Sequence, residues 1–94
     1  MVIGVLKIRI RIEGACSLKE KRKVLKSIKD RLGHLNISVA EVDDQDLWQA
    51  STLGIAVVSN DSQFTNTQMD KIMDFFYQQT AAEVIESYRE VVHI

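Results

Sequence analysis

The sequence has no proline, a single cysteine and no long apolar run, and each absence excludes a class of protein. Because Cys16 has no second cysteine, the chain can form neither an internal disulfide nor a cysteine-based zinc knuckle. No stretch approaches the roughly 18 to 20 apolar residues of a membrane-spanning helix, and the start of the chain lacks the pattern of an export signal. We therefore expect a cytoplasmic protein without a membrane partner.

Motifs of catalysis are missing as well. The four glycines are scattered along the chain, so no glycine-rich phosphate loop is present. His34 and His93 are the only histidines, and neither accompanies a serine or cysteine in a nucleophile motif. These absences favour a binding module that needs no cofactor and no metal over an enzyme.

The sequence does contain a strong separation of charge along its length. Ten of its 12 basic residues lie between positions 7 and 31, and with three opposing acids the first 33 residues carry a net charge of +7. The remaining 61 residues carry two basic and ten acidic residues, a net charge of −8, which the overall charge of −1 conceals. A positive surface of this strength can attract a polyanion.

Hydrophobic patterning predicts a strand and then a helix in the first third of the chain. Residues 6–13 alternate between apolar and charged side chains, as in a strand with one buried and one exposed face. Ser17 and Glu20 form a capping box, which begins a helix that ends near Gly33. The predicted buried stripe of this helix is Leu18, Leu25, Ile28 and Leu32, flanked by Val24 and Leu35.

Four further segments complete the predicted pattern. Residues 37–42 form a short second strand that the acidic run 43–46 ends, and residues 53–58 form a central strand buried on both faces. The turn residues 59–62 begin a second helix, which ends at Thr80 or Ala81. Residues 83–94 form a fourth strand, whose apolar phase slips between Ile85 and Tyr88 in the manner of a bulge.

The predicted order is therefore βαββαβ, the split arrangement of the ferredoxin-like fold. We expect one α+β domain over residues 1–94, a sandwich of a four-stranded antiparallel sheet with two helices on one face. Right-handed crossovers place the first and third strands in the centre of the sheet.

Two groups of basic residues are the candidate nucleic-acid-binding site. They are Lys19, Arg22, Lys23, Lys26 and Lys29 on the first helix, and Lys7, Arg9 and Arg11 on the exposed face of the first strand. A phosphate backbone on either surface would bind in a salt-dependent manner with little sequence preference. Base stacking is not expected, because the first strand has no aromatic residue and the third offers only small or aliphatic side chains to that face.

Two other hypotheses remain open. The separated charges suit a protein-interaction or homodimerisation module equally well, with complementary charged surfaces or a strand edge forming the contact. Carboxylates at Glu41, Asp43, Asp44 and Asp46 can ligate Mg²⁺ or Ca²⁺, but they lack the glycine and terminal glutamate of an EF-hand loop. A solvated turn explains them more simply, so a metal-dependent hydrolase that uses Asp43 and Asp46 ranks last.

Three strings of the sequence resemble one family. They are SLKEKR at 17–22, VAEVD and QDLWQ at 39–43 and 45–49, and LG and VVSND at 53–54 and 57–61. Together they resemble the YlxP-like family of small bacterial ferredoxin-like domains of unknown function, over essentially the whole chain. Asp44 stands where a histidine is expected in many relatives, which weakens an imidazole-based metal or catalytic role for this loop.

The resemblance also implies a setting for the function. Members of the YlxP-like family are often encoded beside genes for translation and ribosome maturation, such as those for ribosome-binding factor A and an initiation factor. This association implies a role around ribosomal RNA or the ribosome. The expected function is therefore a non-catalytic binding module that is RNA- or ribosome-associated through its basic surface.

Overall fold

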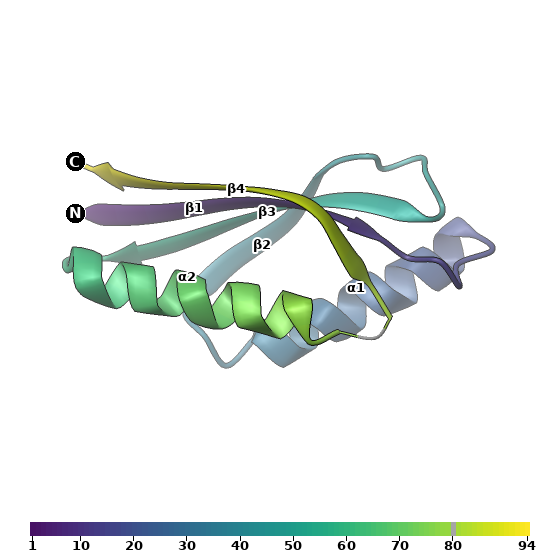
Figure 1. Cartoon of the computed structure of the whole chain (residues 1–94), viewed down its shortest axis with the longest axis horizontal. Helices are drawn as coiled ribbons and strands as arrows, with labels where there is room; N and C mark the ends of the chain where they lie inside the picture. Colours follow the sequence, from purple (N-terminus) through teal and green to yellow (C-terminus); the bar gives the residue numbers. More distant parts are fainter. Residues whose placement is uncertain (80) are drawn as a thin grey trace.

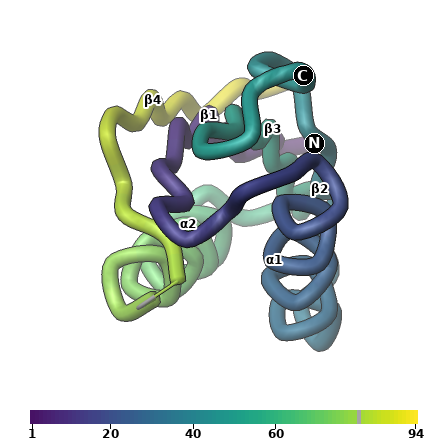
Figure 2. The backbone as a smooth tube through the Cα atoms, turned by 90° about the vertical axis from the view of Figure 1, so that its right-hand side faces the viewer, coloured from purple at the N-terminus to yellow at the C-terminus, as the bar shows by residue number. Residues whose placement is uncertain are grey.

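The chain folds into a four-stranded sheet with two helices against one of its faces (Figure 1). The computed structural model describes residues 1–79 and 81–94. In chain order the elements are β1 Val2–Arg11, α1 Leu18–Leu32, β2 Ile37–Asp43, β3 Ala50–Ser59, α2 Ser62–Tyr77 and β4 Glu83–His93. The strands are antiparallel in the order β2-β3-β1-β4, and both helices lie beneath them (Figure 2). The predicted ferredoxin-like arrangement with β1 and β3 in the centre is confirmed.

β1 begins earlier than its alternation of apolar and charged residues predicted. Val2 and Gly4 extend the buried series that continues through Leu6, whereas Ile3 and Val5 point to the other face and are partly exposed. Because Ile3 and Val5 are also apolar, residues 2–5 do not alternate between apolar and polar side chains, and the pattern did not predict that the strand begins at Val2. A Cβ atom on Gly4 would lie 2.5 Å from Sδ of Met69, so α2 packs directly onto the backbone of β1.

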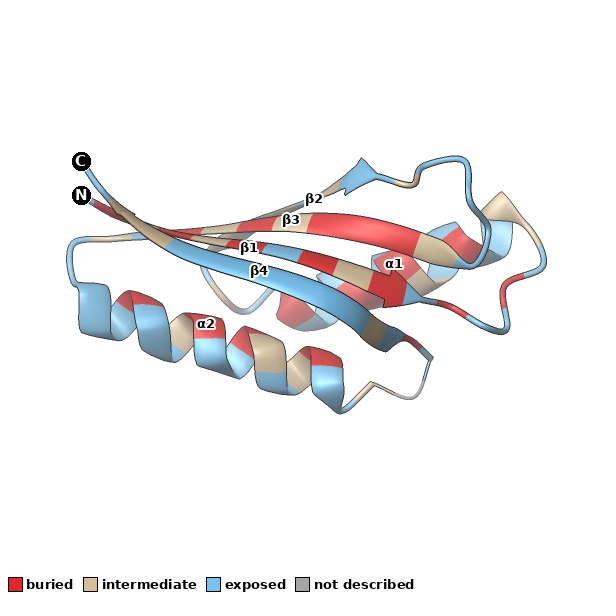
Figure 3. Cartoon of the chain, turned by 45° about the horizontal axis from the view of Figure 1, so that its top comes forward, coloured by how far each residue is buried: buried red, intermediate tan, exposed pale blue. Residues whose placement is uncertain are grey.

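The prediction that the third strand is buried on both faces is wrong. Leu53, Ile55 and Val57 are buried beneath the sheet, but Val58 on the opposite face is 52% exposed. Both helices cover the same face, so the other face of the central strands is open to solvent (Figure 3). An unbroken apolar run here reflects one buried face and one open face that is also aliphatic.

α1 begins at the predicted cap but buries a different residue in its first turn. The hydroxyl of Ser17 accepts a hydrogen bond from the backbone N–H of Glu20 at 3.1 Å, which is one half of the predicted capping box. The carboxylate of Glu20 accepts from the backbone N–H of Cys16 rather than from that of Ser17. Leu25, Ile28 and Leu32 are buried as predicted, whereas Leu18 is only partly buried. Lys21 takes its place in the buried stripe.

α2 is capped by Asp61, whose side chain accepts a hydrogen bond from the backbone N–H of Gln63. Its buried stripe is Thr65, Met69, Ile72 and Phe76, with the predicted Met73 partly buried beside it. The helix ends at Tyr77 rather than at Ala81, because Gln78 forms the C-cap, and the alternative end at Thr80 lies outside the described residues. Neither α1 nor α2 is long and apolar enough to cross a membrane, in the part of the chain that the structure describes.

The bulge predicted in the last strand is confirmed. Arg9 of β1 pairs with Glu86 of β4, but the next residue, Ile10, pairs with Val84, so Ile85 has no partner across the ladder. This extra residue produces the slip in apolar phase between Ile85 and Tyr88. β4 is an edge strand, and most of its residues are exposed (Figure 3).

Candidate functional site

The predicted basic residues of α1 form an exposed row along the helix. Lys19, Arg22, Lys23 and Lys29 are all exposed, and none of the four forms an ion pair with any residue that the structure describes. Lys26 pairs with Asp30 at 3.0 Å, but both side chains are more than 60% exposed, so solvent screens this pair and it contributes little. The row therefore retains most of its positive charge.

The basic residues of β1 are placed very differently. The Nε atom of Arg9 lies 3.1 Å from a carboxylate oxygen of Asp44, and Arg11 lies 3.7 Å from Glu83. Lys7 remains without an ion pair among the described residues, and it lies opposite Tyr88 of β4. The strand cations are thus on the other side of the sheet from α1, and two of the three have a carboxylate partner.

A cleft on this open face confirms its mixed charge. The cleft has a volume of about 560 Å³ and is lined by residues of β1, β3 and β4 and of the end of β2. Its lining residues are Lys7, Arg9, Asp43, Asp44, Thr52, Glu86, Ser87 and Tyr88. Three carboxylates against two cations give no continuous positive surface. Tyr88 of β4 places one aromatic ring on this face, whereas β1 and β3 contribute no aromatic residue to it.

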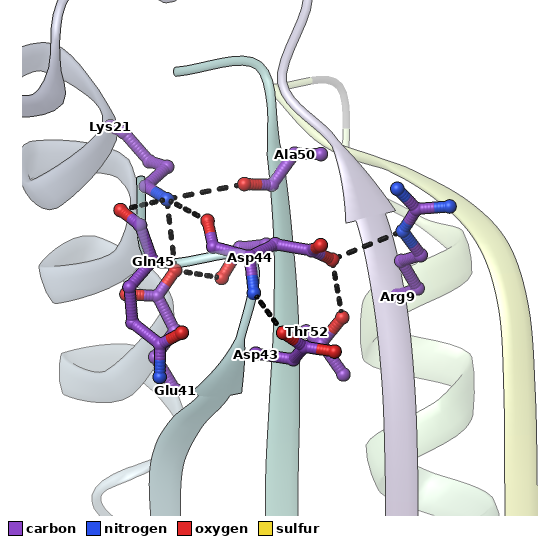
Figure 4. A network of polar contacts seen from close by, with 9 residues as sticks. Arg9, Lys21, Glu41, Asp43, Asp44, Gln45, Ala50 and Thr52 are labelled. Atoms are coloured by element: carbon purple, nitrogen blue, oxygen red, sulfur yellow. Dashed lines mark hydrogen bonds and ion pairs between the residues drawn. The ribbon is translucent and has the colours of Figure 1, made fainter. Parts of the chain in front are cut away.

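A buried lysine organises the connection between β2 and β3 (Figure 4). Lys21 is 2% exposed, and its Nζ atom points from α1 toward four oxygen acceptors. It donates to the carboxylate of Glu41 at 3.0 Å and to the backbone carbonyls of Asp44, Gln45 and Ala50 at 2.8, 3.1 and 3.2 Å. A buried ammonium needs several oxygen partners to replace its hydration, and these four supply them.

The acidic residues of this region act as acceptors in the same network. Glu41 also accepts a hydrogen bond from the hydroxyl of Ser51 at 2.7 Å, and Asp44 accepts from Thr52 at 2.6 Å and from Arg9. The Thr52 hydroxyl is the main cause of a lowered pKa of Asp44, and the Arg9 guanidinium lowers this pKa further. Glu41 and Asp44 are thus occupied within the protein.

Sequence reasoning missed Lys21, although the helical period points to it. At 100° per residue Lys21 lies between Ile28 and Leu32 on the helical wheel, in the middle of the buried stripe. A lysine at the centre of an apolar stripe predicts a buried partner, and the carboxylates at 41–46 were the available ones. Among residues 1–79 and 81–94, no group of three or more His, Cys, Asp or Glu side chains could hold a metal ion.

The sequence is similar to a family and to a curated protein that have no described function. The family described as "Protein of unknown function (DUF503)" matches residues 3–89. The chain is 39% identical over 75 residues to "Uncharacterized protein YlxP" of Bacillus subtilis (strain 168), an alignment that covers 79% of this chain and 82% of the relative.

Two similar solved structures are designed proteins. De novo designed protein Foldit4 is 12% identical, with a TM-score of 0.57 over 98% of each chain. Designed protein LFR1 1, with a ferredoxin fold, is 14% identical, with a TM-score of 0.51 over 100% of this chain and 88% of that one. At these identities the likeness supports the fold alone.

Proposed function

The chain belongs to the DUF503 family, whose description names no activity, and we propose that it binds RNA through the exposed face of α1. The ligand is the phosphate backbone of ribosomal RNA, and binding needs no catalysis and no cofactor. The observation that supports this proposal is the row of four exposed cations, Lys19, Arg22, Lys23 and Lys29, without carboxylate partners among the described residues.

The spacing of the row suits a repeating polyanion. Lys19 and Lys29 are ten residues apart, which is about 15 Å along a helix that rises 1.5 Å per residue. Arg22, Lys23 and Lys26 lie between them, so every turn of this part of α1 carries at least one cation. Glu20, the nearest acid at the start of α1, accepts a hydrogen bond from the backbone N–H of Cys16 and lies to one side of the row.

The proposed interface is α1 rather than the open sheet face, because four of the basic side chains on α1 have no carboxylate partner among the described residues. Arg9 and Arg11 have carboxylate partners at 3.1 and 3.7 Å, and a phosphate would have to compete with them. The row on α1 has no aromatic residue for base stacking, so we expect little sequence preference. Recognition of this kind depends on charge and on the shape of the RNA.

A titration against a fluorescein-labelled ribosomal RNA fragment at several salt concentrations tests the proposal. Four phosphate contacts give a slope of log K against log[salt] of about −3 for a single-stranded segment. The double variant Arg22→Gln/Lys29→Gln should bind about tenfold more weakly at low salt and lower the magnitude of the slope by about 1.4. The matched control is Lys7→Gln/Lys71→Gln, which changes the net charge equally at two exposed lysines outside α1.

Two results would overturn the proposal. One is an affinity of the unmodified protein that does not change with salt. The other is an equal loss of affinity in the α1 variant and in the control, which would show that overall charge and not the row on α1 determines binding.

Association of two copies is the second candidate function. The open outer edge of β4 and the opposite charges of α1 and the 41–46 segment are the features that favour it. Light scattering at low and high ionic strength distinguishes the possibilities. A monomer under both conditions excludes the homodimer, whereas a dimer that dissociates at high salt supports contact through complementary charges.

A further inference from the structure

The connection between β2 and β3 is held at its beginning by buried contacts. Lys21 binds the backbone carbonyls of Asp44 and Gln45, and Asp44 adopts a left-handed backbone with φ of 63° while its side chain binds Arg9 and Thr52. Positive φ is uncommon for residues other than glycine, and although aspartate adopts it more readily than most, the bonds to Arg9 and Thr52 hold Asp44 in this conformation. The first half of the loop is therefore fixed to both α1 and β1.

The other end of the loop is fixed as well. The backbone carbonyl of Gln49 accepts a hydrogen bond from the N–H of Ile12 at 2.9 Å, and its side-chain amide donates to the carbonyls of Ala15 at 3.1 Å and Glu13 at 3.3 Å. Between the two ends, the backbone N–H of Leu47 donates to the carbonyl of Asp44. The loop is thus hydrogen-bonded at both ends and at Leu47 between them.

This well-held loop presents its two largest apolar side chains to solvent. Leu47 is 47% exposed and Trp48 is 53% exposed. Large apolar side chains on a preformed loop are typical of interface anchors, since ordering the loop in advance lowers the entropic cost of binding. Neither side chain belongs to the hydrophobic core cluster, and the exposed half of each can be buried by a partner.

The charge around Leu47 and Trp48 indicates what that partner is. Asp43 and Asp46 are exposed and, among the described residues, neither forms an ion pair. The loop is therefore negative, opposite in sign to α1, and it repels a phosphate backbone. It attracts lysine and arginine side chains next to an apolar surface.

We propose that the 44–49 loop is a protein-docking site, with Trp48 and Leu47 as anchors, for a partner segment that carries basic residues beside apolar ones. This site is separate from the RNA-binding face of α1 and does not depend on it. A protein with both would connect an RNA to a second protein.

The single tryptophan of the chain makes the proposal directly measurable, because all indole emission comes from Trp48. The probe is a phage-displayed library of random peptides without tryptophan, selected on the immobilised full-length protein. Selected peptides should contain Lys or Arg beside Leu, Ile or Phe, and binding of the synthetic peptides should shift the Trp48 emission to shorter wavelength. Trp48→Ala contains no tryptophan, so its affinity and that of the unmodified protein are compared by the anisotropy of a fluorescein-labelled peptide, and the substitution should weaken binding more than tenfold.

Two matched variants serve as controls. Phe64→Ala removes an aromatic side chain of α2 that is 50% exposed and should change peptide affinity less than twofold. Asp46→Asn tests the contribution of the loop's negative charge and should reduce peptide affinity about threefold at low salt but not at high salt. Its control is Asp74→Asn on α2, which should leave peptide affinity unchanged. All four altered residues, Asp46, Trp48, Phe64 and Asp74, are exposed and lie outside the core.

Several outcomes would overturn the proposal. Selected peptides that bind Trp48→Ala as tightly as the unmodified protein, or that are acidic, contradict it. Weaker RNA binding by Trp48→Ala would assign the loop to the nucleic acid, and a dimer that Trp48→Ala converts to a monomer would assign it to a second copy. None of these results bears on the variants of Arg22 and Lys29, so the two proposals fail separately.

Discussion

Replacement of Lys21 by methionine should destabilise the protein strongly. Methionine matches the aliphatic stem of lysine closely, so packing within α1 is largely kept and the change removes the ammonium. The carboxylate of Glu41 then retains only the Ser51 hydroxyl, and the carbonyls of Asp44, Gln45 and Ala50 lose their side-chain donor.

The magnitude follows from the burial of this ion pair. Removing one partner of a buried pair costs about 3 to 5 kcal/mol. The side chain of Glu41 is 19% exposed, so water can reach it in part and the lower end, about 3 kcal/mol, applies. For a chain of this length, that loss lowers Tm by about 12 to 24 °C.

Thermal and urea unfolding of four variants, Lys21→Met, Lys23→Met, Glu41→Gln and the double variant Lys21→Met/Glu41→Gln, measure the effect. Lys23→Met is the matched control, because Lys23 is exposed and without an ion pair among the residues described, and it should change stability by less than about 0.5 kcal/mol. Combining Lys21→Met with Glu41→Gln should be less destabilising than the sum of the single changes, with a coupling of about 1 to 3 kcal/mol. The fluorescence anisotropy of Trp48 should fall in Lys21→Met as the loop loosens. Equal stability of Lys21→Met and Lys23→Met would refute this account of the loop.

Two further predictions concern β1 and its neighbours. Gly4→Ala should lower the free energy of unfolding in urea by about 1 to 3 kcal/mol, because the new Cβ would lie 2.5 and 2.6 Å from side-chain atoms of Met69 and Thr65. Gly14→Ala is the control and should be neutral, because the space around Gly14 is open. Equal losses of stability in the two variants would contradict the close packing at Gly4. The pKa of Asp44 is lowered from its ordinary value of 3.8, so the ionised carboxylate stabilises the folded state at pH values above 3.8. This stabilisation is lost as the pH falls through the folded-state pKa. The stability advantage of the unmodified protein over Asp44→Asn should therefore shrink below about pH 4 in thermal scans. A constant advantage from pH 7 to pH 2 would show that the charge of Asp44 has no such role.

The fold was predictable because its main determinants are local patterns. Alternation in β1, the helix cap at Ser17 and the phase slip at Ile85 each depend on neighbouring residues alone, and the structure contains all three. The number of covered faces is a different matter, since an aliphatic residue such as Val58 has the same sequence pattern on an open face as on a buried one.

The candidate site was only partly predictable for the same reason. Sequence patterning placed Lys19 and Arg22 on an exposed helical stripe, and the structure has them there. It could not show that Arg9 would meet Asp44, because that ion pair joins residues 35 positions apart through the sheet register. The role of Lys21 likewise depends on a loop that comes 20 or more residues later.

The binding of RNA by the exposed face of α1 can be tested most directly by following backbone amide resonances during titration with the ribosomal RNA fragment. The account predicts that shift changes concentrate on residues 18–32, follow the row from Lys19 to Lys29 and disappear at high salt. Changes concentrated on the open face of β1, β3 and β4, with α1 unaffected, would contradict it.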